Sequence, residues 1–252
     1  MHKSGFSNWP VLRTYRGDQL RKIAMPVGGI GTGNIALAGN GALVNWEIMN
    51  RPALKNSPDV SAFLIRVEQE NLPIFAKVLE GPLDTAMYEG PFGAEAKNHG
   101  MPRFRSATFK SAYPFGQVCL EDDRSPVRVT IKSFNPLIPS DTSASSYPLM
   151  VYRCEVENLS DREAIVSVAS NISNFIRPFD KQKSSHVNHN KFISNLNYCA
   201  ISYSSEMSNM IDENNGNFAI ALLHPQNASY RTSWAELTWR DSLLDMWDDF
   251  IE

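Results

Sequence analysis

A glycine-rich stretch near the N-terminus decides the fold of this chain. Residues 23–34 read Ile-Ala-Met-Pro-Val-Gly-Gly-Ile-Gly-Thr-Gly-Asn, and residues 41–52 read Gly-Ala-Leu-Val-Asn-Trp-Glu-Ile-Met-Asn-Arg-Pro. Gly31, Gly33 and Ala36 fit a G-x-G-x-x-A dinucleotide fingerprint, which must open a helix. Gly39 and Gly41 lie where that helix would run, and each glycine costs about 1 kcal/mol in a helix interior. We therefore expect no nucleotide site, but two strands joined by glycines that allow close backbone approach or positive φ.

The composition sets outer bounds on the fold and the function. A chain of 252 residues with 42% hydrophobic content can bury a substantial core. The formal net charge of −3 offers no basic face, so nucleic acid is not an expected partner. No apolar run approaches the roughly 20 residues that span a bilayer, and no signal peptide is visible. We expect a cytoplasmic protein without a membrane span.

Strand signals dominate the rest of the chain. Residues 127–134 alternate apolar and polar side chains, which is typical of a half-buried antiparallel strand. Two hairpins are expected, one from 62–68 with 73–79 and one from 149–157 with 164–172. Further strands are expected at 198–203 and 217–223. Many short strands with Pro, Gly and Asn turns indicate an all-β fold, an antiparallel two-sheet β-sandwich with long loops, at 81–102 and 179–190.

The C-terminal segment, residues 233–252, has helical periodicity. Leu243, Trp247 and Phe250 recur at helical spacing, together with Leu244 and Ile251, and acidic residues take the opposite face. This short amphipathic helix either folds back on the sandwich or leads into another domain. In the second case, Leu243, Trp247 and Phe250 form an interface.

Several separate blocks of the chain resemble the N-terminal domain of glycoside hydrolase family 116, the non-lysosomal glucosylceramidases and bacterial β-glucosidases. They are the glycine-rich stretch, His-Gly-Met-Pro-Arg-Phe-Arg-Ser-Ala-Thr-Phe at 99–109, Ala-Tyr-Pro-Phe-Gly-Gln-Val at 112–118 and Phe-Asn-Pro-Leu-Ile-Pro at 134–139. The resemblance implies an N-terminal extension at 1–19, the family's sandwich domain at 20–232 and a helix at 233–252 that leads toward a catalytic domain.

The same resemblance implies where the family's chemistry lies. Its nucleophile and acid/base belong to a C-terminal (α/α)6 domain, and no position of this chain matches their motifs. We therefore expect a non-catalytic domain that supports such a catalytic domain, in a longer or a separate chain, with a β-glucoside or a glucolipid as the substrate. The alternative is a free-standing sandwich that binds carbohydrate without hydrolysing it.

Candidate contact residues fall in two stretches. Trp46, Glu47, Asn50 and Arg51 combine an aromatic ring with hydrogen-bonding groups, which suits a sugar. Trp46 shares a strand face with apolar neighbours, however, so a core position is the stronger expectation. The Arg103-Phe104-Arg105 sequence places Arg103 and Arg105 where they could contact a sugar or form an interdomain ion pair.

Other polar clusters predict little chemistry, and we expect no catalytic residue, cofactor or metal in this chain. Glu121, Asp122 and Asp123 read as a solvated hairpin turn. His186 and His189 have H-x-x-H spacing but lie in a polar loop without further ligands. The three cysteines, Cys119, Cys154 and Cys199, lie far apart and are expected to be buried and reduced, in agreement with a reducing compartment.

Overall fold

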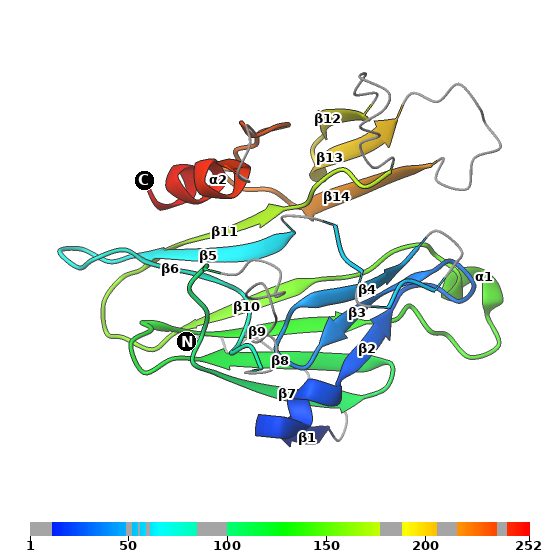
Figure 1. Cartoon of the computed structure of the whole chain (residues 1–252), viewed down its shortest axis with the longest axis horizontal. Helices are drawn as coiled ribbons and strands as arrows, with labels where there is room; N and C mark the ends of the chain where they lie inside the picture. The colour runs from blue at the N-terminus through cyan, green and yellow to red at the C-terminus, as the bar shows by residue number, and fades with distance from the viewer. Residues whose placement is uncertain are drawn as a thin grey trace, which may run out of the picture. The chain divides into compact units, whose positions relative to one another are not determined.

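The computed structural model describes residues 12–48, 52–54, 56–58, 61–84, 100–176, 188–205, 216–235 and 241–252. The chain divides into two compact units, Met1–Asn171 and Ile172–Glu252. The sequence analysis did not place a division at this point. Each unit is therefore described by itself (Figure 1).

One layer of the first unit is a five-stranded antiparallel sheet in the order β1-β7-β8-β9-β10. Its strands are β1 (Arg13–Arg16), β7 (Ser106–Ala112), β8 (Phe115–Glu121), β9 (Val127–Phe134) and β10 (Arg153–Asn158). In β9, buried and half-buried residues alternate along the whole strand, as the apolar-polar pattern predicts.

The described part of the first unit also contains two three-stranded sheets (Figure 1). One is β2 (Ala24–Val27), β3 (Asn34–Ala38) and β4 (Leu43–Glu47); the other has the order β11-β5-β6, from β5 (Ala62–Glu68), β6 (Phe75–Val78) and β11 (Ile165–Asn171). A single core cluster holds buried residues from all three sheets, among them Leu37, Ile65 and Val118. The fold is thus all-β and sandwich-like, as expected, and the hairpin β5-β6 is confirmed.

The second expected hairpin is wrong in its pairing. Both of its strands form, but β10 pairs with β9 and β11 pairs with β5. The turn chemistry between them is present, because the Asn158 side chain donates to the Arg162 carbonyl oxygen at 2.7 Å and accepts from the Ser160 N–H at 3.1 Å. That turn carries the chain from one sheet to another instead of folding it back on the same sheet.

Two short helical segments complete the described part of the first unit. A 3₁₀ helix, η1 (Gly17–Lys22), follows β1, and α1 (Thr142–Ser145) follows β9. The Asp141 carboxylate caps α1 by accepting the Ala144 N–H at 2.8 Å. Of the long connection expected at 81–102, residues 81–84 and 100–102 are described, and they contain no strand.

The second unit contains a three-stranded antiparallel sheet in the order β12-β13-β14. Its strands are β12 (Asn188–Ser194), β13 (Tyr198–Ser205) and β14 (Asn217–Leu223). Phe218 of β14 has ring contacts with Tyr203 and with Phe175, at centroid distances of 5.8 and 5.2 Å. The loop expected at 179–190 is wrong at its end, because residues 188–190 begin β12.

The C-terminal helix is α2 (Asp241–Ile251), which begins later than the expected residue 233. Ser233, Trp234 and Ala235 have no regular structure, and residues 236–240 lie outside the described part of the chain. The Ala235 N–H donates to the Asp245 carboxylate at 3.1 Å, and Arg231 forms an ion pair with Asp249. Within the described residues, no helix is long and apolar enough to cross a membrane.

Candidate functional site

The glycine-rich connection between β2 and β3 lines a cavity of about 520 Å³ in the first unit. The wall includes residues 28–31 and 33–34 of this connection, Glu47 at the end of β4, Tyr113 in the β7–β8 turn, and residues 135–137 after β9. Its volume lies in the range of small-molecule sites, roughly 300 to 1,000 Å³. The stretch that matches the dinucleotide fingerprint by pattern alone thus lines part of a ligand-sized cavity.

Glycine is required in this wall for two separate reasons. A Cβ on Gly28 would lie 2.4 Å from the Gly33 carbonyl oxygen, and one on Gly29 would lie 2.3 Å from the Tyr147 carbonyl oxygen. Gly31 and Gly33 adopt φ of 73° and 83°, which disfavours any residue with a Cβ. The expectation of close approach and positive φ is confirmed. Because glycine has no side chain, these residues line the cavity with backbone atoms.

Asn135 holds the connection in place. Its side-chain oxygen accepts the Gly28 N–H at 2.7 Å, and its side-chain nitrogen donates to the Pro26 carbonyl oxygen at 3.0 Å. The Ile30 N–H donates to the Ser145 carbonyl oxygen at 2.8 Å, so the segment after β9 fixes two points of the loop. Sequence reasoning did not single out Asn135, although it lies in the 134–139 block that carried the family resemblance.

Glu47 is the carboxylate of this cavity. Its Oε2 accepts from the Asn34 side chain at 3.4 Å and its Oε1 accepts the Ala53 N–H at 3.3 Å. Among the described residues that line the cavity, there is no second carboxylate and no Lys, Arg or His. Glu47 therefore faces the hollow without a cationic neighbour in the described wall. Asn50 and Arg51, the other predicted contacts of this stretch, lie outside the described residues.

Trp46 belongs to the core and not to the cavity wall. Trp46 is 4% exposed. Its backbone N–H donates to the Asn56 carbonyl oxygen at 3.0 Å, and its indole N–H donates to the Leu43 carbonyl oxygen at 3.3 Å. The strand is irregular next to Trp46, because Asn45 has φ of 50° and the register between β3 and β4 shifts there. A core position, the stronger expectation, agrees with this burial.

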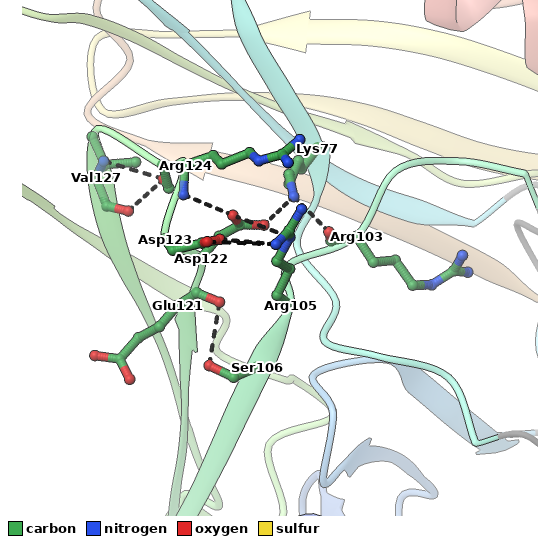
Figure 2. A network of polar contacts seen from close by, with 10 residues as sticks. Lys77, Arg103, Arg105, Ser106, Glu121, Asp122, Asp123, Arg124 and Val127 are labelled. Atoms are coloured by element: carbon green, nitrogen blue, oxygen red, sulfur yellow. Dashed lines mark hydrogen bonds and ion pairs between the residues drawn. The ribbon is translucent and has the colours of Figure 1, made fainter.

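A second polar cluster joins the β8–β9 turn to β6 (Figure 2). The Lys77 ammonium forms an ion pair with the Asp122 carboxylate and donates to the Arg103 carbonyl oxygen at 2.7 Å. The Arg124 N–H donates to the same carboxylate at 2.9 Å, and the Arg105 guanidinium lies 3.8 Å from it. Figure 2 shows these donors converging on Asp122.

The expectation of a solvated acidic turn is wrong for Asp122. Its side chain is fully buried, whereas those of Glu121 and Asp123 are exposed. Burial raises the pKa of the Asp122 carboxyl, but the hydrogen bonds from Lys77 and the Arg124 N–H outweigh burial and hold that pKa below its usual value. A carboxylate compensated in this way stays ionised and is a structural ion, not a general acid.

Arg103 and Arg105 pair with carboxylates of the same unit. The Arg103 Nε donates to Glu80 at 3.1 Å, with both side chains nearly buried, and its guanidinium points away from Asp122 (Figure 2). Arg105 lies half-exposed, 3.2 Å from Asp123. A contact of either arginine with a sugar or another domain stays a prediction.

The described histidines and cysteines form no ligand cluster. Within the described residues, no group of three His, Cys, Asp or Glu side chains could hold a metal ion. His189 lies in β12, paired with Ser204 of β13, while His186 falls outside the described residues. All three cysteines are free. Burial, then the nearby Glu155 carboxylate, raises the pKa of Cys154 to about 12.

The predicted interface residues lie on α2. Leu243, Trp247 and Phe250 are half-buried, whereas Met246 on the same helix is buried and Leu244 is 63% exposed. The apolar residues of this helix therefore differ in exposure, from buried at Met246 to exposed at Leu244. A role of Leu243, Trp247 and Phe250 in an interface stays a prediction.

The sequence matches one protein-family model over residues 24–252, and that model is described as "beta-glucosidase 2, glycosyl-hydrolase family 116 N-term". The match begins at the first residue of β2. It therefore includes the glycine-rich connection, the cavity residues and α2.

Proposed function

The chain belongs to glycoside hydrolase family 116, and we propose that it acts as the non-catalytic N-terminal domain that supports an (α/α)6 catalytic domain. The observation that carries this proposal is the match of the family's N-terminal region to residues 24–252. The catalytic domain would be that of a β-glucosidase or glucosylceramidase, with a β-glucoside or glucolipid as the substrate.

The carboxylates of the described residues support a non-catalytic role. A retaining glycosidase needs two carboxyl groups about 5 Å apart across the scissile bond. Asp122 is neutralised by Lys77, and Asp123 lies on the surface beside Arg105. Glu47 lines the cavity without a second carboxylate among the described wall residues. Asp122 is thus held as an ion, and Glu47 has no partner carboxylate in the described wall, so neither matches the pair that the reaction requires.

The free cysteines support a reducing compartment. Cys119, Cys154 and Cys199 are all unpaired, and burial raises the pKa of Cys154 and of Cys119. A cytoplasmic location therefore remains our prediction.

Adding the purified chain to a separate catalytic domain tests the supporting role. A family 116 β-glucosidase is expressed without its own N-terminal domain, and its hydrolysis of an aryl β-glucoside and its melting temperature are measured with and without the purified chain. We expect the chain to co-elute with the catalytic domain and to raise its activity or its melting temperature. An unrelated β-sandwich domain is the control. The same effect from the control, or no effect from the chain, would contradict a supporting role.

A second candidate function is carbohydrate binding by the chain itself. The observation that favours it is the ligand-sized cavity with Glu47 and backbone glycine in its wall. This function does not need a catalytic partner, so the two proposals are tested separately.

A further inference from the structure

The cavity of the first unit has a wall that can approach a ligand closely. Gly28, Gly29, Gly31 and Gly33 contribute backbone atoms only. At Gly28, Gly29 and Gly33 a Cβ would meet other backbone atoms of the protein, whereas at Gly31 it would meet no atom within 4 Å. Because Asn135 and the Ser145 carbonyl oxygen fix the connection, the wall is formed before any ligand arrives.

Glu47 in the wall has hydrogen-bonding capacity that the described residues do not use. A carboxylate with two oxygens offers about four lone-pair positions. Among the described residues, the donors to Glu47 are the Asn34 side chain and the Ala53 N–H, one on each oxygen. The remaining positions can accept two further donors, such as neighbouring hydroxyl groups of one ligand.

The wall also offers an exposed aromatic ring. Tyr113 in the β7–β8 turn is 65% exposed, although a tyrosine ring gains free energy when its face is covered. Ile30 in the same wall is 58% exposed. An apolar surface and a hydroxyl acceptor therefore border the same hollow.

This combination selects among ligand classes. No Lys, Arg or His lies among the described wall residues, so a phosphate or another anion would meet the Glu47 carboxylate without compensation. A fully apolar ligand would leave that carboxylate desolvated and short of donors. A pyranose ring satisfies both features, because it has hydroxyl donors at its edge and C–H groups on its face.

We propose that this cavity is a binding site for a neutral pyranose, with Tyr113 covering the ring face and Glu47 accepting its hydroxyl groups. The site differs from the sugar contact expected around Trp46, since Trp46 is buried in the core. It rests on the second candidate function, carbohydrate binding, for which it names the site and the ligand class, and it is independent of the supporting role.

The experiment is an NMR titration of the purified chain with methyl β-D-glucopyranoside. We expect the amide signals of Gly28, Gly29, Gly31 and Gly33 to shift in a saturable way. Tyr113→Ala should weaken binding by about tenfold or more, whereas Tyr113→Phe keeps the ring and should keep most of the affinity. Because the Tyr113 side chain is exposed, neither change should prevent folding, which a thermal melt verifies.

Two controls complete the test. Tyr147→Ala removes a ring of similar exposure, 57%, that is not part of the wall, and it should leave binding unchanged. Glu47→Gln keeps an acceptor but loses the charge, so it should weaken binding several-fold.

Three results would overturn the proposal. They are no saturable shift with the glucoside, binding that Tyr113→Ala and Glu47→Gln leave unchanged, and binding of choline or inorganic phosphate in preference to the glucoside. None of them affects the supporting role, because co-elution with a catalytic domain is measured without using this cavity.

Discussion

Replacing single glycines of the β2–β3 connection separates the two reasons for which they are needed. In Gly31→Ala the new Cβ meets no atom within 4 Å, so the only penalty is the φ of 73°. In Gly33→Ala the residue has φ of 83°, and the new Cβ also lies 2.7 Å from the Glu47 carbonyl oxygen and 2.9 Å from the Ile48 Cα. Both neighbours are backbone atoms, so the strand β4 itself must move.

The magnitudes follow from these geometries. The left-handed conformation costs a residue with a Cβ roughly 1 to 2 kcal/mol, which is the whole loss expected for Gly31→Ala. Displacing packed atoms adds about 1 to 3 kcal/mol, so Gly33→Ala should lower the free energy of unfolding by about 2 to 5 kcal/mol. Gly31→Asn should cost less than Gly31→Ala, because asparagine tolerates positive φ.

Urea denaturation of the matched variants measures these differences. We expect the midpoints to fall in the order wild type, Gly31→Asn, Gly31→Ala and Gly33→Ala, with an unchanged slope. Equal losses for Gly31→Ala and Gly33→Ala would refute the close approach between this connection and β4. A larger loss for Gly31→Asn than for Gly31→Ala would refute the positive φ.

Three further predictions follow from burial and charge. Asp122→Asn should cost about 3 to 5 kcal/mol, because Lys77 loses its buried partner. Since the folded pKa of Asp122 lies below its ordinary 3.8, its stabilisation is present above that pH and lost as the pH falls through the folded value. Melting temperatures over an acid pH series should therefore fall less steeply in Asp122→Asn, and parallel curves would contradict this. Cys154, with a pKa of about 12, should resist a thiol reagent at pH 8 until the chain unfolds, and rapid labelling of the folded chain would contradict its burial. If α2 presents an interface, Trp247→Ser with Phe250→Ser should improve solubility with little change in melting temperature, while an early melt would show that these side chains stabilise the chain itself.

The parts of the fold that depend on local pattern were predictable from the sequence. The alternation in 127–134 predicted the strand β9, and the apolar runs around 69–72 predicted the hairpin β5-β6. Gly39 and Gly41 argue against the helix that a nucleotide site requires, and they lie in the turn between β3 and β4. Each of these signals lies within a window of a few residues.

The remaining features depend on partners that are distant in the sequence. The turn at 158–163 has ordinary hairpin chemistry, but the pairing of β10 and β11 is decided by β9 and β5. Asp122 reads as a solvated turn residue because its partner Lys77 lies on a different strand pair. Asn135 fixes Gly28 across 107 residues. No periodicity records such contacts.

The candidate site was predictable only in part. Glu47 was a candidate contact with a sugar or another domain; it lines the cavity, and that contact stays a prediction. Trp46 was weighed as an aromatic contact with a core position as the stronger expectation, and it is buried next to the bulge at Asn45. Tyr113 takes the place of the aromatic residue in the wall, and it comes from a turn between two strands of the other layer. Its position depends on how the sheets pack.

Hydrolysis of an aryl β-glucoside by the purified chain tests the non-catalytic role most directly. The account predicts a rate equal to that of the buffer at every pH, because Asp122 is held as an ion by Lys77 and Glu47 has no second carboxylate in the described wall. Robust turnover that is lost in Glu47→Gln, or on mutating Glu121 or Asp123, would contradict it.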